Sequence, residues 1–239
     1  LRRDATPRFY LYRQSMGTHT QIGVVGLVRV ADYDNNRIRK HEHTRPDKED
    51  DRTQHIVALD GNDESVFLTY RAEAAIDARV NQAVAAAPGL DFVAEDGVRH
   101  TIWSADDATT SALEKHFARL TLLYIADGHH RCAAASRAAQ LRRSSGRAGD
   151  GHEYFLATVI PHNQVRILDY NRVVKDLNGL TSAQFLTRLA DSFEVTPVQQ
   201  KQPQQPRQFC LYLDARWYRL DARPNSVRGD ALGSLDVSI

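Results

Sequence analysis

The chain has 239 residues, 42% of them apolar and 26% charged, which excludes collagen-like, coiled-coil and wholly disordered proteins. Its formal net charge is +1, so its composition gives no electrostatic argument for binding nucleic acid. No apolar run approaches the ~18 residues that a membrane-spanning helix needs. The two cysteines cannot form a disulfide framework, which favours a cytoplasmic location.

The hydrophobic pattern predicts alternating strands and helices along the first half of the chain. Residues 8–13 and 20–30 predict a hairpin whose second strand is apolar on both faces and therefore central in its sheet. Pro46 excludes a helix running through the polar segment 37–52. Further elements are expected as a helix from Lys48 that is capped by Thr44 or Asp47 and carries Ile56 and Leu59 inward, a strand at 66–70, a helix at 72–87, a hairpin at 91–94 and 98–103, a helix at 106–120 and a buried strand at 122–126.

The second half contains a shorter set of elements. They are expected as a helix at 132–143, strands at 154–160 and 165–169, a helix at 182–193, a Gln/Pro-rich linker at 199–208 and a hairpin at 209–213 and 217–220. We therefore predict a mixed α/β or α+β fold. The linker divides it into a main domain at 1–198 and, at 209–239, a hairpin followed by the start of a truncated segment.

The segment from Asp127 to Arg131, with the sequence Asp-Gly-His-His-Arg, provides the strongest functional signal. It follows an apolar strand and opens a helix, so that unpaired N–H groups and the positive end of the helix dipole can receive an anion. Gly128 allows a close backbone approach, Arg131 adds a planar donor pair for phosphate oxygens, and the histidines can titrate near neutral pH. The structural alternative is that Asp127 caps the helix and the histidines line a surface turn.

A second candidate is the polar loop His41-Glu42-His43-Thr44, with Asp51 and Arg52 beyond it. It combines a carboxylate base, imidazoles and a hydroxyl, and we expect it to fold over the Asp127–Arg131 junction. A solvated charged loop is the alternative. The histidines also suggest a metal site formed by His41, His43, His129 and Asp127, although neither segment has a recognised ligand spacing.

The junction motif, the elements His41-Glu42-x-Thr44 and Asp51-Arg52, and the segment 96–100 leading to Trp103 resemble a widespread prokaryotic family known as domain-of-unknown-function family 1015. Their order and spacing match that family across residues 23–195. Members of the family are longer at both ends, which implies that this chain is a central portion.

That family is in turn similar to the ParB/sulfiredoxin superfamily, in which a Gly-x-x-Arg motif holds nucleotide phosphates. The resemblance implies a ParB/sulfiredoxin-like core over residues 1–198 with additional hairpins and helices. Gly128 and Arg131 match the motif, and His130 matches the histidine of the sulfiredoxin version. The sulfiredoxin cysteine falls at His129, which removes that nucleophile and argues against sulfinic acid repair.

The resemblance implies chemistry on a small phosphometabolite or nucleotide, with ATP or ADP and Mg²⁺ as cofactors. A kinase relative suggests serine or phosphoserine as the substrate. Nucleic acid and membrane are not expected as partners, and a homo-oligomer stays open. The expected residues are Glu42, His43, Asp51 and His129 in catalysis, and Thr44, Arg52, Asp127, Gly128, His130 and Arg131 in cofactor binding.

Three functions follow from the residues and the resemblance together. The first is an enzyme that transfers a phosphoryl group to or from a small metabolite, with Glu42 or Asp51 as the base. The second is a metal-dependent phosphohydrolase. The third is a non-catalytic nucleotide-binding regulatory module.

Overall fold

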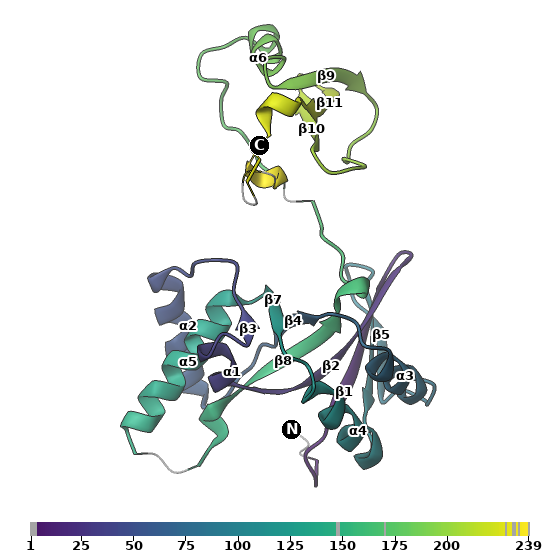
Figure 1. Cartoon of the computed structure of the whole chain (residues 1–239), viewed down its shortest axis with the longest axis vertical. Coiled ribbons are helices and arrows are strands. Elements are labelled where there is room, and N and C mark those ends of the chain that lie inside the picture. The colour runs from purple at the N-terminus through teal and green to yellow at the C-terminus, as the bar shows by residue number, and fades with distance from the viewer. Residues whose placement is uncertain are drawn as a thin grey trace. The chain divides into compact units, whose positions relative to one another are not determined.

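The computed structural model describes residues 4–146, 149–169, 171–227, 229–230, 233 and 235–238. The chain divides into two compact units, Leu1–Arg166 and Ile167–Ile239 (Figure 1). The presence of both helices and strands in the first unit confirms the predicted mixed α+β class. The ParB/sulfiredoxin-like core stays a prediction.

The first unit alternates strands and helices, as its hydrophobic pattern predicts. Its elements in chain order are β1 (Tyr10–Met16), β2 (His19–Arg29), α1 (Val30–Asp34), β3 (Ile38–Arg39), α2 (Pro46–Leu59), β4 (Val66–Tyr70), α3 (Ala74–Ala83), β5 (Leu90–Val93), β6 (Arg99–Ser104), α4 (Asp107–Phe117), β7 (Leu123–Asp127), α5 (His129–Ser144), β8 (Tyr154–Pro161) and short 3-10 turns at Gly151–Glu153 and His162–Gln164.

The strands form one sheet in the order β3-β7-β4-β8-β2-β1-β6-β5. β2 lies inside this sheet between β8 and β1, as its apolar faces predict. The sheet combines antiparallel pairs with two parallel pairs, β3 with β7 and β4 with β8. The mixture arises because β3, β4 and β7 enter the sheet from segments separated by helices rather than by tight turns.

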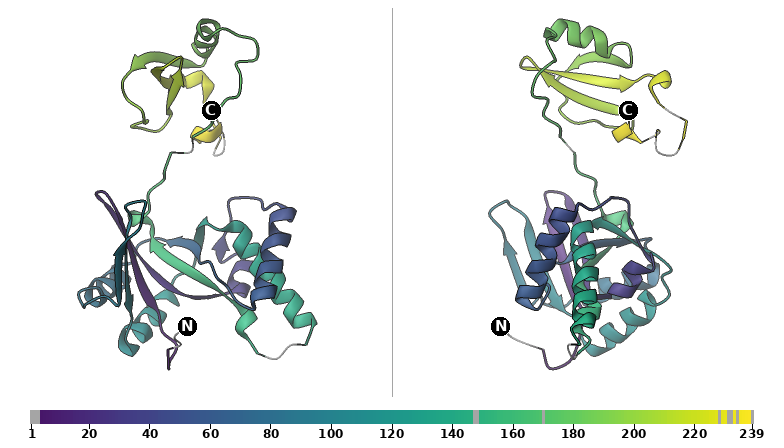
Figure 2. Two further views of the ribbon diagram at one scale, coloured as in Figure 1. Left: turned by 180° about the vertical axis from the view of Figure 1, so that it is seen from behind. Right: turned by 90° about the vertical axis from the view of Figure 1, so that its left-hand side faces the viewer.

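The core follows the alternation of side chains along these strands. In β4, the side chains of Val66, Leu68 and Tyr70 are buried and their intervening neighbours are partly exposed. Helices α2 and α5 lie side by side at one end of the sheet, and α3 and α4 lie together at the other (Figures 1 and 2). Among the described residues, no helix has the length and apolar character that a membrane span requires.

The second unit is a small sheet with a helix. Strands β9 (Phe193–Val198), β10 (Gln208–Leu213) and β11 (Arg216–Ala222) pair antiparallel in the order β10-β11-β9, and helix α6 (Ser182–Leu189) precedes them. The predicted domain boundary at residue 198 is therefore wrong. β9 pairs with β11, from Phe193 opposite Ala222 to Val198 opposite Trp217, so α6 and β9 belong with the C-terminal hairpin.

Several predicted element bounds also differ from those in the structure. Helix α2 begins at Pro46 with Arg45 as its N-cap and no side-chain cap, because proline suits the first helical position. Leu59 is exposed at the end of this helix, whereas Ile56 packs against the core. The strand predicted at 165–169 is absent: β8 ends at Pro161, residues 165–169 pair with no strand of the described chain, and Ile167 is 97% exposed.

Candidate functional site

The sheet places the loop after β3 beside the start of α5. β3 runs parallel to β7, with Ile38 opposite Leu123 and Arg39 opposite Tyr124. Because parallel strands end at the same edge of a sheet, the chain leaving β3 meets the chain that leaves β7 and enters α5. Two segments 88 residues apart in the sequence thereby come into contact.

His129 is the centre of the contact between these segments. Its side chain is 4% exposed, and its Nδ1 lies 3.5 Å from Oε2 of Glu42, whose side chain is 59% exposed. The main-chain N–H of His41 donates to Nε2 of His129 over 3.4 Å. A neutral ring that accepts at Nε2 carries its proton on Nδ1, so these contacts assign the Nδ1–H tautomer facing Glu42.

The neighbouring histidines complete this part of the site. The ring of His41 stands edge-on to that of His129, with 4.3 Å between the ring centroids and an interplanar angle of 84°. Nε2 of His130 accepts a hydrogen bond of 3.1 Å from the main-chain N–H of Arg45. Both histidines of the junction thus hold the loop after β3 in place, which supports the prediction that this loop folds over the junction.

The environment of His129 favours the neutral form of its imidazole. Burial lowers its pKa below the ordinary value, the nearby His41 lowers it further, and Glu42 acts in the opposite direction. An unfolded chain therefore takes up a proton below pH ~6.5 that the folded chain takes up only at lower pH. The stabilising effect of a neutral His129 should be lost as the pH falls below this value.

We expect the NMR titration of the His129 ring to show a midpoint below ~6.5, the ordinary value of a histidine. The same spectra recorded across the acid range should show unfolding setting in as His129 becomes protonated. A His129 midpoint at or above ~6.5 would contradict the lowered pKa assigned to this buried ring.

Gly128 makes the junction between β7 and α5. It is the N-cap of α5, with φ 98° and ψ 31°, in the left-handed region that favours glycine. A Cβ atom at this position would lie 3.0 Å from Nε of Arg131 and 3.2 Å from its Cζ. The absence of a side chain therefore permits both the turn and the return of the Arg131 guanidinium over it.

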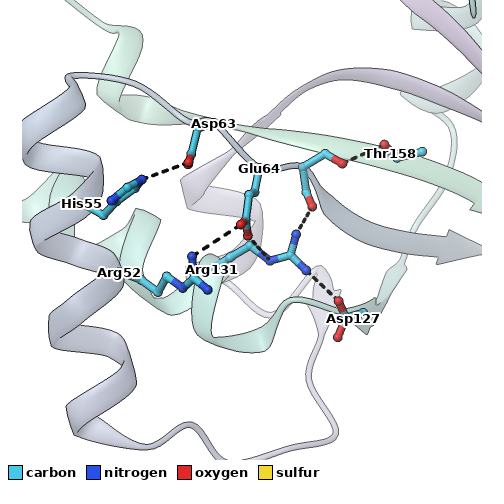
Figure 3. A network of polar contacts seen from close by, with 8 residues as sticks. Arg52, His55, Asp63, Glu64, Asp127, Arg131 and Thr158 are labelled. Atoms are coloured by element: carbon cyan, nitrogen blue, oxygen red, sulfur yellow. Dashed lines mark hydrogen bonds and ion pairs between the residues drawn. The ribbon is translucent and has the colours of Figure 1, made fainter. Parts of the chain in front are cut away.

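Arg131 is held by acceptors from the neighbouring strand ends (Figure 3). Its Nη2 donates to Oδ2 of Asp127 over 2.6 Å, its Nη1 donates to the carbonyl oxygen of Ser65, and its Nε lies 3.8 Å from Oε2 of Glu64. The guanidinium expected to bind phosphate thus has protein partners in this structure. Its contacts tie the start of α5 to the entry of β4.

A second arginine joins this ionic cluster. Arg52 of α2 lies 3.6 Å from Oε1 of Glu64, so Glu64 stands between two guanidinium groups (Figure 3). Glu64 and Ser65 were not predicted as site residues. They meet Arg131 because β4 pairs antiparallel to β7, with Phe67 opposite Asp127. A polar pair before a buried strand was the only signal, and the sequence does not show which strands are neighbours.

The structure places the remaining predicted site residues, Thr44, His43 and Asp51, on the polar loop and on α2. The hydroxyl of Thr44 donates to Glu49 of α2, which ties the loop to that helix. His43 is exposed in the loop, and Asp51 is exposed on α2. Cys132 is fully buried, and burial raises the pKa of its thiol to about 12, which disfavours a nucleophilic thiolate.

The predicted metal-ligand set is brought together only in part. His41 and His129 are neighbours, but Asp127 is paired with Arg131 and His43 is not in the cluster. Glu42 takes the third position instead. The structure therefore has two groups at the start of α5: an imidazole–carboxylate group of His41, Glu42 and His129, and an ionic group of Arg52, Glu64, Asp127 and Arg131.

Comparison with known proteins gives a family and no named function. No curated protein and no solved structure matches the chain. One family model does match, and it covers residues 1–238. The chain therefore belongs to the family described as "Protein of unknown function (DUF1015)", the family that its junction motif and polar loop resemble.

Proposed function

We propose that this protein is an enzyme that transfers a phosphoryl group to or from a small metabolite, with its reaction centre at the start of α5. One observation carries the proposal: the fold brings the exposed carboxylate of Glu42 to within 3.5 Å of the buried His129 at the first residue of a 16-residue helix. A proton acceptor and an anion-binding helix end thereby share one place.

The anion is received by main-chain groups. The first N–H groups of α5 have no acceptor inside the helix, and the first intrahelical bond recorded at this end is from Cys132 to Gly128. The helix dipole adds roughly half a positive charge at the same point. A phosphate group at residues 129–131 would satisfy these donors without displacing the partners of Arg131.

The proton is transferred by Glu42. Its carboxylate is exposed, so a substrate hydroxyl can reach it, whereas His129 is buried and orients it. The attacking hydroxyl oxygen forms a bond to phosphorus, the bond to the leaving oxygen breaks, and Glu42 takes the hydroxyl proton. The donor is a nucleotide such as ATP or ADP with its Mg²⁺, and serine is the acceptor to test first.

The proposal is tested by screening nucleotides, serine and phosphorylated metabolites for thermal stabilisation, followed by ³¹P NMR of any ligand that binds. A ligand at about 100-fold its dissociation constant should stabilise the folded state by ~2.7 kcal/mol. Stabilisation together with product formation is expected. Binding without turnover would instead indicate a nucleotide-binding regulatory module, and no binding would contradict both functions.

Replacing Arg131 by alanine distinguishes its two roles. If Arg131 releases Asp127 to contact phosphate, the change should weaken phosphate-ester binding about ten- to a hundredfold, since a charged hydrogen bond contributes roughly 1.5–3 kcal/mol. If Arg131 only stabilises the turn between β7 and α5, the midpoint of urea unfolding should fall while the affinity for the phosphate ester stays the same. The control is Arg52→Ala, which removes a partner of Glu64 that is more exposed. Isothermal titration of both variants measures the affinities.

A further inference from the structure

The group His41, Glu42 and His129 has the spacing of a metal site. One ligand atom from each residue lies within 4.8 Å of the others. Nδ1 of His129 and Oε2 of Glu42 are 3.5 Å apart, longer than the ~2.7–2.9 Å of a charged hydrogen bond. Around a tetrahedral ion with bonds of ~2.0–2.1 Å, neighbouring ligand atoms are about 3.3–3.4 Å apart. The observed separation is thus close to that of two ligands sharing an ion.

We propose that His41, Glu42 and His129 bind a divalent first-row transition ion of the zinc class. Two imidazoles and one carboxylate are the ligand types that such ions prefer, whereas Mg²⁺ prefers an all-oxygen octahedral environment. Three protein ligands leave a fourth tetrahedral position open, as in catalytic rather than structural zinc sites. Because the Glu42 side chain is 59% exposed, solvent could reach an ion bound there.

The surrounding structure fixes one ligand and leaves two adjustable. His129 is buried at the first turn of α5 and is held by the packing of that helix. His41 and Glu42 are exposed in the loop after β3 and can close around an ion without disturbing the core. One buried ligand on a helix and two exposed ligands on a loop allow the site to form in the folded protein.

Binding of the ion would change one hydrogen bond. An ion at Nδ1 of His129 moves the imidazole proton to Nε2, which then cannot accept from the main-chain N–H of His41. That bond is 3.4 Å long, so little stabilisation is lost. The amide resonance of His41 should therefore shift when the ion binds, which surface binding elsewhere would not cause.

The inference goes beyond the proposed function, and the two are alternatives for Glu42, because a carboxylate that holds the ion is not free to act as the base. Ion binding can be measured without a substrate. The probes are Zn²⁺ by isothermal titration and Co²⁺ by its visible absorption, with protein that carries no histidine tag. We expect one ion per chain, a tetrahedral Co²⁺ spectrum, displacement of Co²⁺ by Zn²⁺ and no displacement by excess Mg²⁺.

Three variants locate the site. His41→Ala and Glu42→Gln change exposed residues, so both should fold, and each should weaken Zn²⁺ binding at least about tenfold. His43→Ala, in the same loop but outside the cluster, should leave the affinity for Zn²⁺ unchanged. An affinity unaffected by His41→Ala, an equal loss in His43→Ala, or no 1:1 binding by the wild-type chain would each overturn the site.

The two proposals fail in different ways. His41→Ala that loses Zn²⁺ but keeps turnover supports the metal site and shows that phosphoryl transfer does not require it. A wild-type chain that shows turnover but no 1:1 Zn²⁺ binding overturns the metal site and leaves the proposed function standing. Binding of Zn²⁺ without turnover of any tested substrate supports the metal site and contradicts the proposed phosphoryl transfer.

Discussion

Replacing Glu42 by glutamine should lower turnover by roughly 10²–10⁴-fold, the contribution typical of a general base. Glutamine keeps the shape of the side chain and its exposed position beside His129, but it cannot take the proton of an attacking hydroxyl. Under the proposal, the phosphate is received by main-chain groups of α5, so binding of the phosphate-containing ligand should survive. Steady-state kinetics and titration of the same preparation measure the two effects separately.

Two further carboxylates sharpen this test. Glu95→Gln alters an exposed carboxylate of the β5–β6 turn and should leave turnover unchanged. Asp51→Asn tests the competing base, which the structure places exposed on α2. If Asp51→Asn is inactive and Glu42→Gln is active, the two roles are exchanged. If both retain turnover, the polar loop is a solvated segment and the assignment of the base is wrong.

The Gly128→Ala change should destabilise the folded protein by about 2–4 kcal/mol. An alanine at φ 98° incurs ~1–2 kcal/mol of backbone strain, and its Cβ would lie 3.0 Å from Nε of Arg131, so the guanidinium would have to shift. The shift weakens the charged hydrogen bonds of Arg131 to Asp127 and Ser65, which are worth roughly 1.5–3 kcal/mol each when fully lost. Urea unfolding measures the difference.

Gly97→Ala is the matched control for this change. Gly97 also has a positive φ, 81°, but a Cβ there would meet no atom within 4 Å. Its replacement should therefore incur only the backbone strain of ~1–2 kcal/mol. An equal loss in the two variants would show that the Arg131 contacts contribute no stability. The turn would then require glycine for its backbone conformation alone.

Local patterns in the sequence predicted most elements of the first unit. The strand predicted at 66–70 is β4, because residues 66–70 form a short run rich in β-branched and aromatic residues. The sequence also predicted helix α4 and the hairpins around Gly17 and Gly97, since helical spacing and glycine turns are local signals. The predicted strand at 165–169 was wrong because short apolar runs show no evidence of a pairing partner.

The two motifs of the site were likewise visible in the sequence, but their geometry was not. His129 and Arg131 are two residues apart on α5, so a helix turns them to different sides. Only the tertiary structure shows that one side meets Glu42 and the other meets Glu64. Which residues each side of α5 contacts depends on which strand ends lie beside β7.

The sequence by itself therefore determined the mixed α+β class, most element positions and the two chemical motifs, because each depends on residues close together in the chain. The tertiary structure decided that β3 pairs parallel with β7 and that β4 pairs antiparallel with it. These pairings join segments far apart in the chain, and their energies come from burial and strand hydrogen bonds that no local pattern contains. These strand pairings bring Glu42 beside His129 and surround Arg131 with hydrogen-bond acceptors.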